Sequence, residues 1–295
     1  MVSVDLPRIT VVTPSYNQGR FLEQTIRSVL DQGYGNLEYI ICDGGSTDES
    51  VDVIKKYENQ LAWWCTGKDR GQTDAINKGL GRATGHLHTF INSDDVLYPG
   101  SLMAAARAFE TGHEWITGWA MFLEATGGEW PQLPESYKRR FDWFHCNPIS
   151  QQGTFWSARL TRELGKFRED MHFGFDYEFW LRIVLKANVM PHLIRKCMGG
   201  YRLHEASKTV SQYEKFKVEF KAVREEYWPL LTPDEQAAAI RRKKRAESEQ
   251  HRLSGWMAMQ KGDLIAAREH ARQLFRANRF STETWKLMYS AYRGK

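Results

Sequence analysis

Three short polar segments hold the residues of this sequence that are best suited to chemistry. They are Pro14-Ser15-Tyr16-Asn17, the stretch 43–48 (Asp-Gly-Gly-Ser-Thr-Asp) and Ser93-Asp94-Asp95. The adjacent carboxylates of Asp94 and Asp95 repel each other, and a divalent cation that prefers oxygen ligands, Mg²⁺ or Mn²⁺, would relieve this repulsion. Such a metal commonly takes further ligands from substrate phosphates. On the dipeptide alone, a turn that caps the next helix is the simpler interpretation.

The spacing of apolar residues predicts the elements that position these segments. Short apolar runs predict strands at 8–13, 37–42, 61–65 and 87–92, and helical spacing predicts helices between them at 19–32, 49–57 and 73–83. Strands that alternate with helices indicate an α/β fold with a mostly parallel sheet flanked by helices. Ligands bind beyond the carboxyl ends of the strands in such sheets, so we expect the three polar segments at one ligand-binding edge. Neither a Walker lysine motif nor a GxGxxG motif follows the first strand, so a bound diphosphate would be neutralised by metal.

Length and composition exclude several classes of protein. The 295 residues suit one large domain or two ordinary ones, and 42% hydrophobic with 13% aromatic residues exclude overall disorder. No apolar run approaches the roughly 18 residues that a membrane-spanning helix needs, and no signal-peptide pattern is visible. The four cysteines stand singly, which favours the cytosol over a disulfide or zinc framework. We therefore expect a cytoplasmic protein.

Charge is distributed unevenly along the chain. Residues 216–295 carry 17 Lys and Arg against 10 Asp and Glu, whereas residues 1–215 carry 24 against 26. This shift predicts a domain boundary between an α/β domain (1–215) and a basic α-helical region (216–295), with helices at 234–247, 263–278 and 282–292. The basic run 241–245 is either a solvated helix face or a contact for an anionic membrane, and no recognised motif beside it indicates nucleic acid.

Four consecutive stretches together resemble family 2 glycosyltransferases of the GT-A fold. They are ITVVTPSYNQGRFLEQTIRSVLDQ, IICDGGSTDES, GKDRGQTDAINKGLGRATG and FINSDDVLYPGSL. The resemblance extends from about Arg8 to Thr209, in the order and spacing of the family. It implies a Rossmann-like GT-A domain that transfers a sugar from a nucleotide-diphosphate donor to an acceptor hydroxyl, with inversion at the anomeric carbon.

The resemblance implies a nucleotide site at the matching positions. Pro14 and Tyr16 would border the nucleobase and ribose. Asp43 would accept a hydrogen bond from the base, typically a uracil imide, and Asp74 would make a further base or ribose contact.

The resemblance also implies a metal site for Mn²⁺ or Mg²⁺. Ser93-Asp94-Asp95 matches the DxD-type motif, with Asp95 as the direct metal ligand and Asp94 at ribose or metal. His204 resembles a late histidine that completes the metal shell in some relatives, although a lone histidine is more often a surface or packed residue. Arg202 could meet a phosphate.

The family's general base lies in an acidic motif at the start of a helix, which 174–182 (GFDYEFWLR) matches. Asp176 aligns with the base, and a carboxylate within hydrogen-bond reach of the acceptor hydroxyl is a suitable group. Glu178 is the nearest competitor, but residues two apart point to different helix faces. Asp176 as a simple N-cap is the structural alternative.

Residues 149–156 are similar to a segment on the acceptor side in relatives. Gln151 and Gln152 could hydrogen-bond sugar hydroxyls, and Trp156 could stack on a pyranose face, although most tryptophans belong to the core.

The expected partners are a nucleotide-sugar donor and a glycan or lipid-linked glycan acceptor, as in the synthesis of a bacterial surface polysaccharide or glycolipid. The basic C-terminal helices suggest contact with a partner protein or with the inner face of the membrane. One alternative is a nucleotidyltransferase, but TPSYNQGRF lacks the glycine-rich basic loop expected after its first strand. The other is a non-catalytic nucleotide-sugar-binding or scaffold protein, against which Asp95 and Asp176 argue.

Overall fold

The computed structural model describes residues 6–124, 127–133, 138–205, 207–208 and 212–294. The chain divides into two compact units, Met1–Trp143 with Asn147–Leu230 and Phe144–Cys146 with Leu231–Lys295. The charge shift near residue 215 does not mark the border between these units, because helix α8 (Tyr213–Tyr227) belongs to the first of them.

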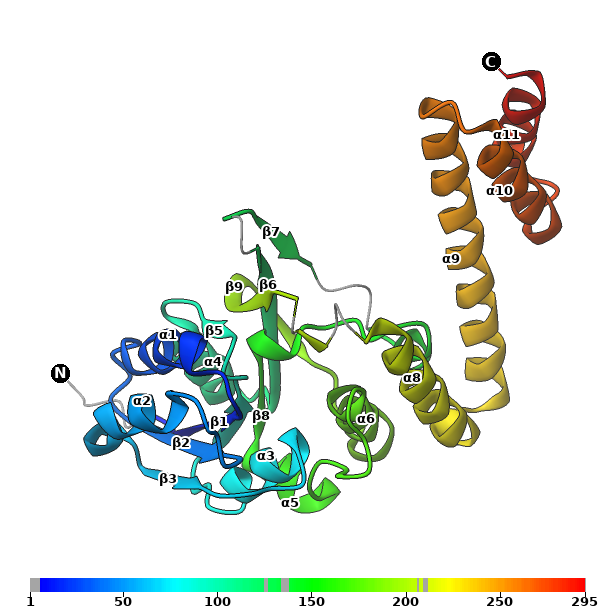
Figure 1. The fold of residues 1–295 in the computed structure, drawn as a ribbon. Coiled ribbons are helices and arrows are strands. Elements are labelled where there is room, and N and C mark those ends of the chain that lie inside the picture. Colours follow the sequence, from blue (N-terminus) through cyan, green and yellow to red (C-terminus); the bar gives the residue numbers. More distant parts are fainter. Residues whose placement is uncertain (1–5, 125–126, 134–137, 206, 209–211, 295) are drawn as a thin grey trace. The chain divides into compact units, whose positions relative to one another are not determined.

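A nine-stranded sheet forms the centre of the first unit (Figure 1). Its strands lie in the order β3-β2-β1-β4-β8-β6-β9-β5, and β7 pairs with β6 off this path. The strands are β1 (Ile9–Ser15), β2 (Leu37–Asp43), β3 (Trp63–Thr66), β4 (Leu87–Phe90), β5 (Val96–Leu97), β6 (Trp115–Glu124), β7 (Glu129–Gln132), β8 (Thr154–Ser157) and β9 (His192–Leu203). Besides α8, the helices are α1 (Gly19–Leu30), α2 (Ser50–Lys56), α3 (Gln72–Leu80), α4 (Ser101–Glu110), α5 (Ala158–Leu164) and α6 (Phe175–Arg182).

The four strands expected from the apolar runs are present and parallel. β1 lies between β2 and β4, with Ile9 opposite Leu37 and Leu87, and β2 pairs with β3. Parallel neighbours in this register end at the same edge, so the loops after β1, β2, β3 and β4 come together there.

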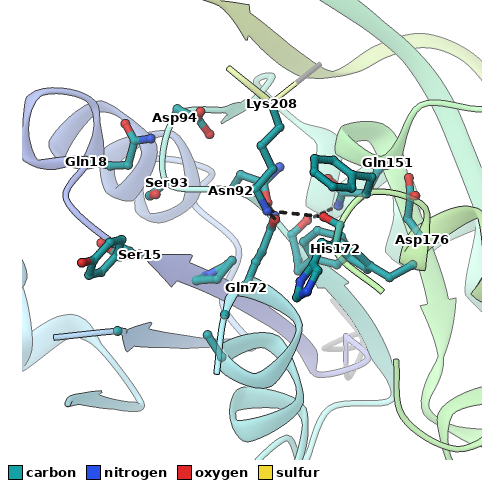
Figure 2. A pocket seen from close by; sticks show the side chains of 18 of the residues that line it. Ser15, Gln18, Gln72, Asn92, Ser93, Asp94, Gln151, His172, Asp176 and Lys208 are labelled. Atoms are coloured by element: carbon teal, nitrogen blue, oxygen red, sulfur yellow. Dashed lines mark hydrogen bonds between the residues drawn. The ribbon is translucent and has the colours of Figure 1, made fainter. Parts of the chain in front are cut away.

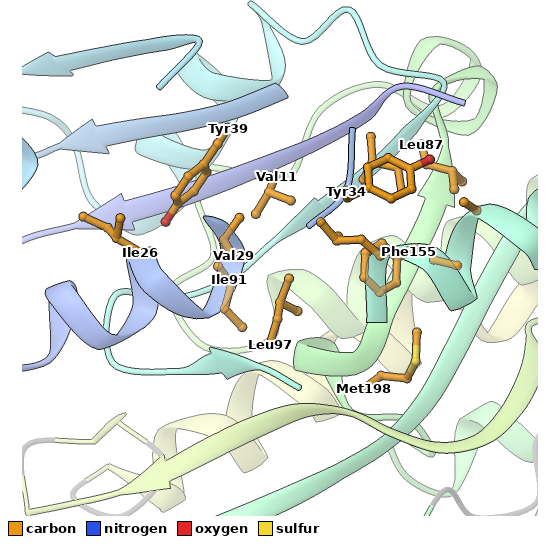
Figure 3. Close-up of a cluster of buried hydrophobic side chains, with 14 of the residues drawn as sticks. Val11, Ile26, Val29, Tyr34, Tyr39, Leu87, Ile91, Leu97, Phe155 and Met198 are labelled. Atoms are coloured by element: carbon orange, nitrogen blue, oxygen red, sulfur yellow. The ribbon is translucent and has the colours of Figure 1, made fainter. Parts of the chain in front are cut away.

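Alternation along β1 builds the two layers that hold this edge in place. Ile9 and Val11 are fully buried in a core with Ile26 and Val29 of α1 and residues of α2 and α4 (Figure 3). Val12 faces the opposite side and contacts α3 at Gly79, where an added Cβ would lie 2.4 Å from the Val12 Cγ1. Helices therefore cover both faces of the parallel half, as the alternating pattern predicts.

The remaining half of the sheet is mixed. β8 is antiparallel to both β4 and β6, and β9 is parallel to β6 with an irregular register around Trp119. The residues that face the first half come from the segments on both sides of β8 and from the end of β9 and the segment after it.

The second unit is a helical bundle. Its helices are α9 (Pro233–Gln260), α10 (Leu264–Ala277) and α11 (Thr282–Arg293). Thr232 and Glu235 form a reciprocal capping box at the start of α9. A small apolar core includes Ala267, Ala271 and Leu287. The three helices expected from the sequence are present, and α9 continues well beyond residue 247. Within the described ranges, no helix is both long and apolar enough to cross a bilayer.

Candidate active site

The loops at the carboxyl ends of the parallel strands border one cavity of about 650 Å³ (Figure 2). Ser15 ends β1, Gly44 follows β2, Asp69 follows β3 and Asp94 follows β4, and all four line the cavity. The opposite wall comes from residues Gln151, Gln152, His172, Phe173, Phe175, Asp176, Tyr201, Ser207, Lys208 and Phe216. The polar segments singled out in the sequence therefore meet at one edge of the sheet.

The two adjacent aspartates after β4 point in different directions. Asp94 lines the cavity, and its side chain is 21% exposed. Asp95 is 1% exposed and accepts hydrogen bonds from Asn92 (3.0 Å), Gln152 (2.9 Å) and the Arg202 backbone N–H (3.1 Å). Burial, reinforced by the charge of Asp94, raises the pKa of Asp95. The oxygens of Asp95, the residue expected to be the direct metal ligand, are therefore turned into the protein, and Asp94 is the carboxylate that faces the cavity.

Two residues at the end of β9, Arg202 and His204, contact the loop after β4 that carries Asp94. The Nε2 atom of His204 lies 3.0 Å from the Asp94 Oδ2, and its ring packs on Phe21. Arg202 donates through Nε to the Asp94 carbonyl oxygen (3.0 Å) and through Nη2 to Gln24 (2.6 Å). Arg202 does not line the cavity, so its contact with a phosphate is not supported, whereas His204 is adjacent to the cavity-facing carboxylate.

Asp176 reaches the same cavity from the other side, in the first turn of α6. Its Oδ1 accepts from the Tyr177 backbone N–H at 2.7 Å, and its Oδ2 lies 3.4 Å from the Asn147 amide nitrogen. Burial raises the pKa of this partly exposed carboxyl to about 6, although both hydrogen bonds favour the ionised form. A carboxylate with this pKa is ionised at neutral pH and is more basic than an ordinary aspartate.

Residues 10–175 match the family described as glycosyl transferase family 2. The chain belongs to this family. It is 29% identical over 182 residues to an uncharacterized glycosyltransferase, MT1564, of Mycobacterium tuberculosis, covering 61% of this chain and 70% of the relative. It is 36% identical over 173 residues to the uncharacterized glycosyltransferase alr2836 of Nostoc, covering 55% and 51%. A putative teichuronic acid biosynthesis glycosyltransferase of Bacillus subtilis, TuaG, is 39% identical over 92 residues, covering 30% and 36%.

Solved structures show the same fold at low sequence identity. TarS (1–349) of S. aureus, in complex with UDP-GlcNAc, has a TM-score of 0.63 at 17% identity, covering 98% of this chain and 92% of that one. The mannosyltransferase PcManGT of Pyrobaculum calidifontis, in complex with GDP-Man and Mn²⁺, has a TM-score of 0.61 at 15% identity, covering 98% and 81%. The GT-A-like fold and the glycosyltransferase class are confirmed, and family membership decides against the nucleotidyltransferase alternative.

Two aspartates of this family 2 enzyme that were expected at the nucleotide have partners within the protein. Asp43 is 2% exposed, and both of its oxygens accept hydrogen bonds, from the Gly45 and Ser46 N–H groups and from side-chain hydroxyls. Asp74 is paired with Arg70 (2.9 Å) and Lys78 (3.0 Å), and these contacts hold its pKa well below its usual range. Neither residue lines the cavity, whereas Pro14, Tyr16 and Asp69 do.

Glu178, expected as the competitor for the base, and Trp156, expected at a pyranose face, are both enclosed in the protein. Glu178 is fully buried and bonds Arg182 (2.8 Å) and the Tyr227 hydroxyl (2.6 Å), so it does not compete with Asp176. Trp156 is also fully buried, donates its Nε1–H to Thr161 at 2.8 Å and packs against aromatic rings of the core. A sugar cannot stack on it.

Gln151 and Gln152, expected to hydrogen-bond sugar hydroxyls, both line the cavity. Gln152 donates a hydrogen bond from its side-chain amide to the Asp95 carboxylate. Gln151 is only 7% exposed and donates to the Phe90 carbonyl (2.5 Å), and its Oε1 has no hydrogen-bond partner among the described residues. A buried acceptor without a partner is costly unless a ligand supplies the donor.

Three side chains that the sequence did not single out form a hydrogen-bonded series along the cavity wall. Gln72 donates to Asn92 at 2.6 Å and accepts from the Lys208 ammonium at 2.8 Å (Figure 2). Lys208 also lies 3.4 Å from the His172 carbonyl. Lys208 thus brings a positive charge to the cavity that Asp94 lines.

The cavity fits a divalent metal of the kind that the family suggests. Asp94 offers a part-exposed carboxylate with the His204 imidazole beside it. No group of three or more His, Cys, Asp or Glu side chains suited to a metal occurs in the described ranges. A metal bound there would take its remaining ligands from water and substrate phosphates, as metals held by one or two carboxylates commonly do.

Proposed function

We propose that this chain is an inverting, metal-dependent glycosyltransferase that uses a nucleotide-diphosphate sugar, with uridine as the nucleoside. The observation that supports this most strongly is that Asp94 and Asp176 line one cavity from opposite walls. Asp94 could bind a metal and Asp176 could accept a proton, and the cavity that they share has the size of a small-molecule site.

The donor would lie along the carboxyl edge of the sheet. Tyr16, 62% exposed at the cavity, would cover the nucleobase, and the Asp69 carboxylate would accept its imide hydrogen in place of Asp43. The diphosphate would lie between Asp94 and the Lys208 ammonium. A Mn²⁺ or Mg²⁺ ion held by Asp94, with His204 beside it, would offset negative charge on the leaving diphosphate. The Oε1 of Gln151 would accept a hydrogen bond from a sugar hydroxyl.

Asp176 would act as the general base. Its carboxylate takes the proton of the acceptor hydroxyl, the hydroxyl oxygen bonds to the anomeric carbon, and the bond from that carbon to the diphosphate oxygen breaks. A single displacement of this kind inverts the configuration. A pKa near 6 suits the task, because the group is ionised at neutral pH and still basic enough to share the proton in the transition state.

The acceptor would be a glycan or a lipid-linked glycan of a bacterial surface polysaccharide. Supporting this is the relative that is a putative teichuronic acid biosynthesis glycosyltransferase. Arg241 and Lys243–Arg245 of α9 are exposed and could bring the enzyme to an anionic membrane, each contributing about 1 kcal/mol. Sedimentation with anionic vesicles but not with neutral ones would support this contact, and equal sedimentation with both would exclude it.

A donor screen tests the catalytic proposal. Nucleotide release from UDP-, GDP- and dTDP-sugars should favour a UDP-sugar and require Mn²⁺ or Mg²⁺. The Asp176→Asn variant should bind the donor normally and release no nucleotide, and Asp31→Asn, at an exposed carboxylate of the same unit, should match the wild type. Normal turnover by Asp176→Asn would refute the base, and turnover undiminished by chelation would refute the metal.

A further inference from the structure

Glu219 of helix α8 binds the segment that leads into α6. Its Oε1 accepts from the backbone N–H of His172 (3.0 Å), and its Oε2 accepts from the N–H groups of Phe173 (2.9 Å) and Gly174 (2.8 Å). One carboxylate thus satisfies three successive backbone donors, and charge-assisted bonds of this type are stronger than neutral ones. The last of these residues immediately precedes the helix whose first turn carries Asp176.

Side-chain packing also holds residues 172–174 and the start of α6 against α8. The Phe173 ring lies 5.0 Å from that of Phe216, and Tyr177 lies 4.8 Å from Phe220, so aromatic side chains on both sides of Asp176 pack on α8. At Gly174 an added Cβ would lie 3.0 Å from the Phe220 ring, so the backbone approaches α8 closely. The segment 172–174 is therefore held by α8 through its backbone as well as through its side chains.

The charges around this contact are few in the described part of the chain. Lys208 and Lys215 carry ammonium groups 5.9 and 5.7 Å from the centre of the Phe173 ring, and His172 is the other titratable side chain of the segment. Burial is the main reason that the pKa of Asp176 is raised, and the negative charge of Glu219 adds to it. Glu219 therefore bonds the segment next to Asp176, and its negative charge contributes to the raised pKa of Asp176.

We propose that Glu219 is a positioning residue for Asp176: it anchors residues 172–174 to α8 so that the base faces the cavity. This inference rests on the proposed role of Asp176 as the base. Under this proposal α8 contributes to catalysis, although it lies outside residues 10–175, which match the family.

Three variants test the proposal. Glu219→Ala removes all three bonds, Glu219→Gln keeps the shape and an acceptor but removes the charge, and Glu225→Gln alters a 68% exposed carboxylate on the same helix. Amide hydrogen exchange at 172–174, measured by mass spectrometry, needs no substrate. Nucleotide release from the donor found in the screen gives kcat, KM and their pH dependence.

Amide exchange at 172–174 should be faster in Glu219→Ala, and kcat should fall about 10- to 100-fold. The KM for the donor should change much less, because a displaced base impairs mainly the chemical step. In Glu219→Gln the acidic limb of kcat/KM should move to lower pH by less than about one unit, because a like charge near Asp176 is gone. Glu225→Gln should match the wild type in every measurement.

Wild-type exchange in Glu219→Ala would overturn the anchoring, and wild-type kcat in that variant would overturn the role in catalysis. Should Glu219→Ala fail to fold, an unchanged kcat and pH profile in Glu219→Gln would overturn the proposal. The Asp176→Asn variant separates the two claims. Normal turnover by it refutes the base itself, whereas its inactivity beside a fully active Glu219→Ala refutes only the positioning role.

Discussion

Replacing Asp176 by Asn should stabilise the folded protein while it removes the proposed base. Burial raises the pKa of this carboxyl from 3.8 to about 6. The folded protein then binds the proton more tightly than the unfolded chain, so the ionised carboxylate lowers the free energy of unfolding above about pH 6 and has no effect below about pH 4. A shift of this size corresponds to about 3 kcal/mol at most, and solvent screening of a partly exposed group reduces this to about 1–3 kcal/mol.

Urea unfolding at two pH values measures this difference. Asparagine has the same shape without the charge, so Asp176→Asn should be more stable than the wild type by about 1–3 kcal/mol at about pH 7.5 and by about half as much at about pH 5. Asp31→Asn, whose side chain is 66% exposed, serves as the control and should change the free energy of unfolding by less than about 0.5 kcal/mol. A variant no more stable than the wild type at the higher pH, or a gain that is the same at both pH values, would refute a buried, destabilised carboxylate at this position.

Further substitutions test individual assignments. Asp94→Asn should reduce the Mn²⁺-dependent part of donor binding by at least about tenfold in calorimetry, whereas Asp69→Asn should weaken donor binding equally with and without metal; a metal effect retained in Asp94→Asn would contradict the metal assignment. Glu178→Gln should lower the free energy of unfolding by about 3–5 kcal/mol, because it leaves Arg182 buried without its counter-charge, and wild-type stability in urea would contradict that role. Trp156→Ala should cost about 3–5 kcal/mol in the same assay and leave donor affinity unchanged, and a selective loss of donor or acceptor binding would instead support a sugar contact.

The parallel half of the sheet was predictable because its strands are short apolar runs with turn residues between them. β6 and β9 were not predicted. β9 carries charged residues through its length and is only partly buried, so it lacks the apolar run that identifies β1. Helix α8 was also missed, although Phe216, Phe220, Val223 and Tyr227 have helical spacing. The boundary placed at residue 215 from the charge shift separated this apolar stripe from the domain on which it packs.

The location of the site followed from topology, but the direction of single side chains did not. Asp94 and Asp95 are chemically identical neighbours, and only the bonds from Asn92, Gln152 and the β9 backbone determine which one turns inward. The pairing of Glu178 with Arg182, four residues on in one helix, was readable from spacing. The burial of Trp156 depends on strands and helices that are distant in sequence, so no local pattern reveals it.

A crystal structure of the Asp176→Asn variant with Mn²⁺ and the selected donor would show whether Asp94 and Asp176 act on one bound glycosyl unit. We expect a metal bonded to the Asp94 carboxylate and to the diphosphate, with the anomeric carbon facing the substituted asparagine side chain across a space that one hydroxyl group or water molecule fills. A donor bound elsewhere, or a sugar whose anomeric carbon faces away from that side chain, would contradict it.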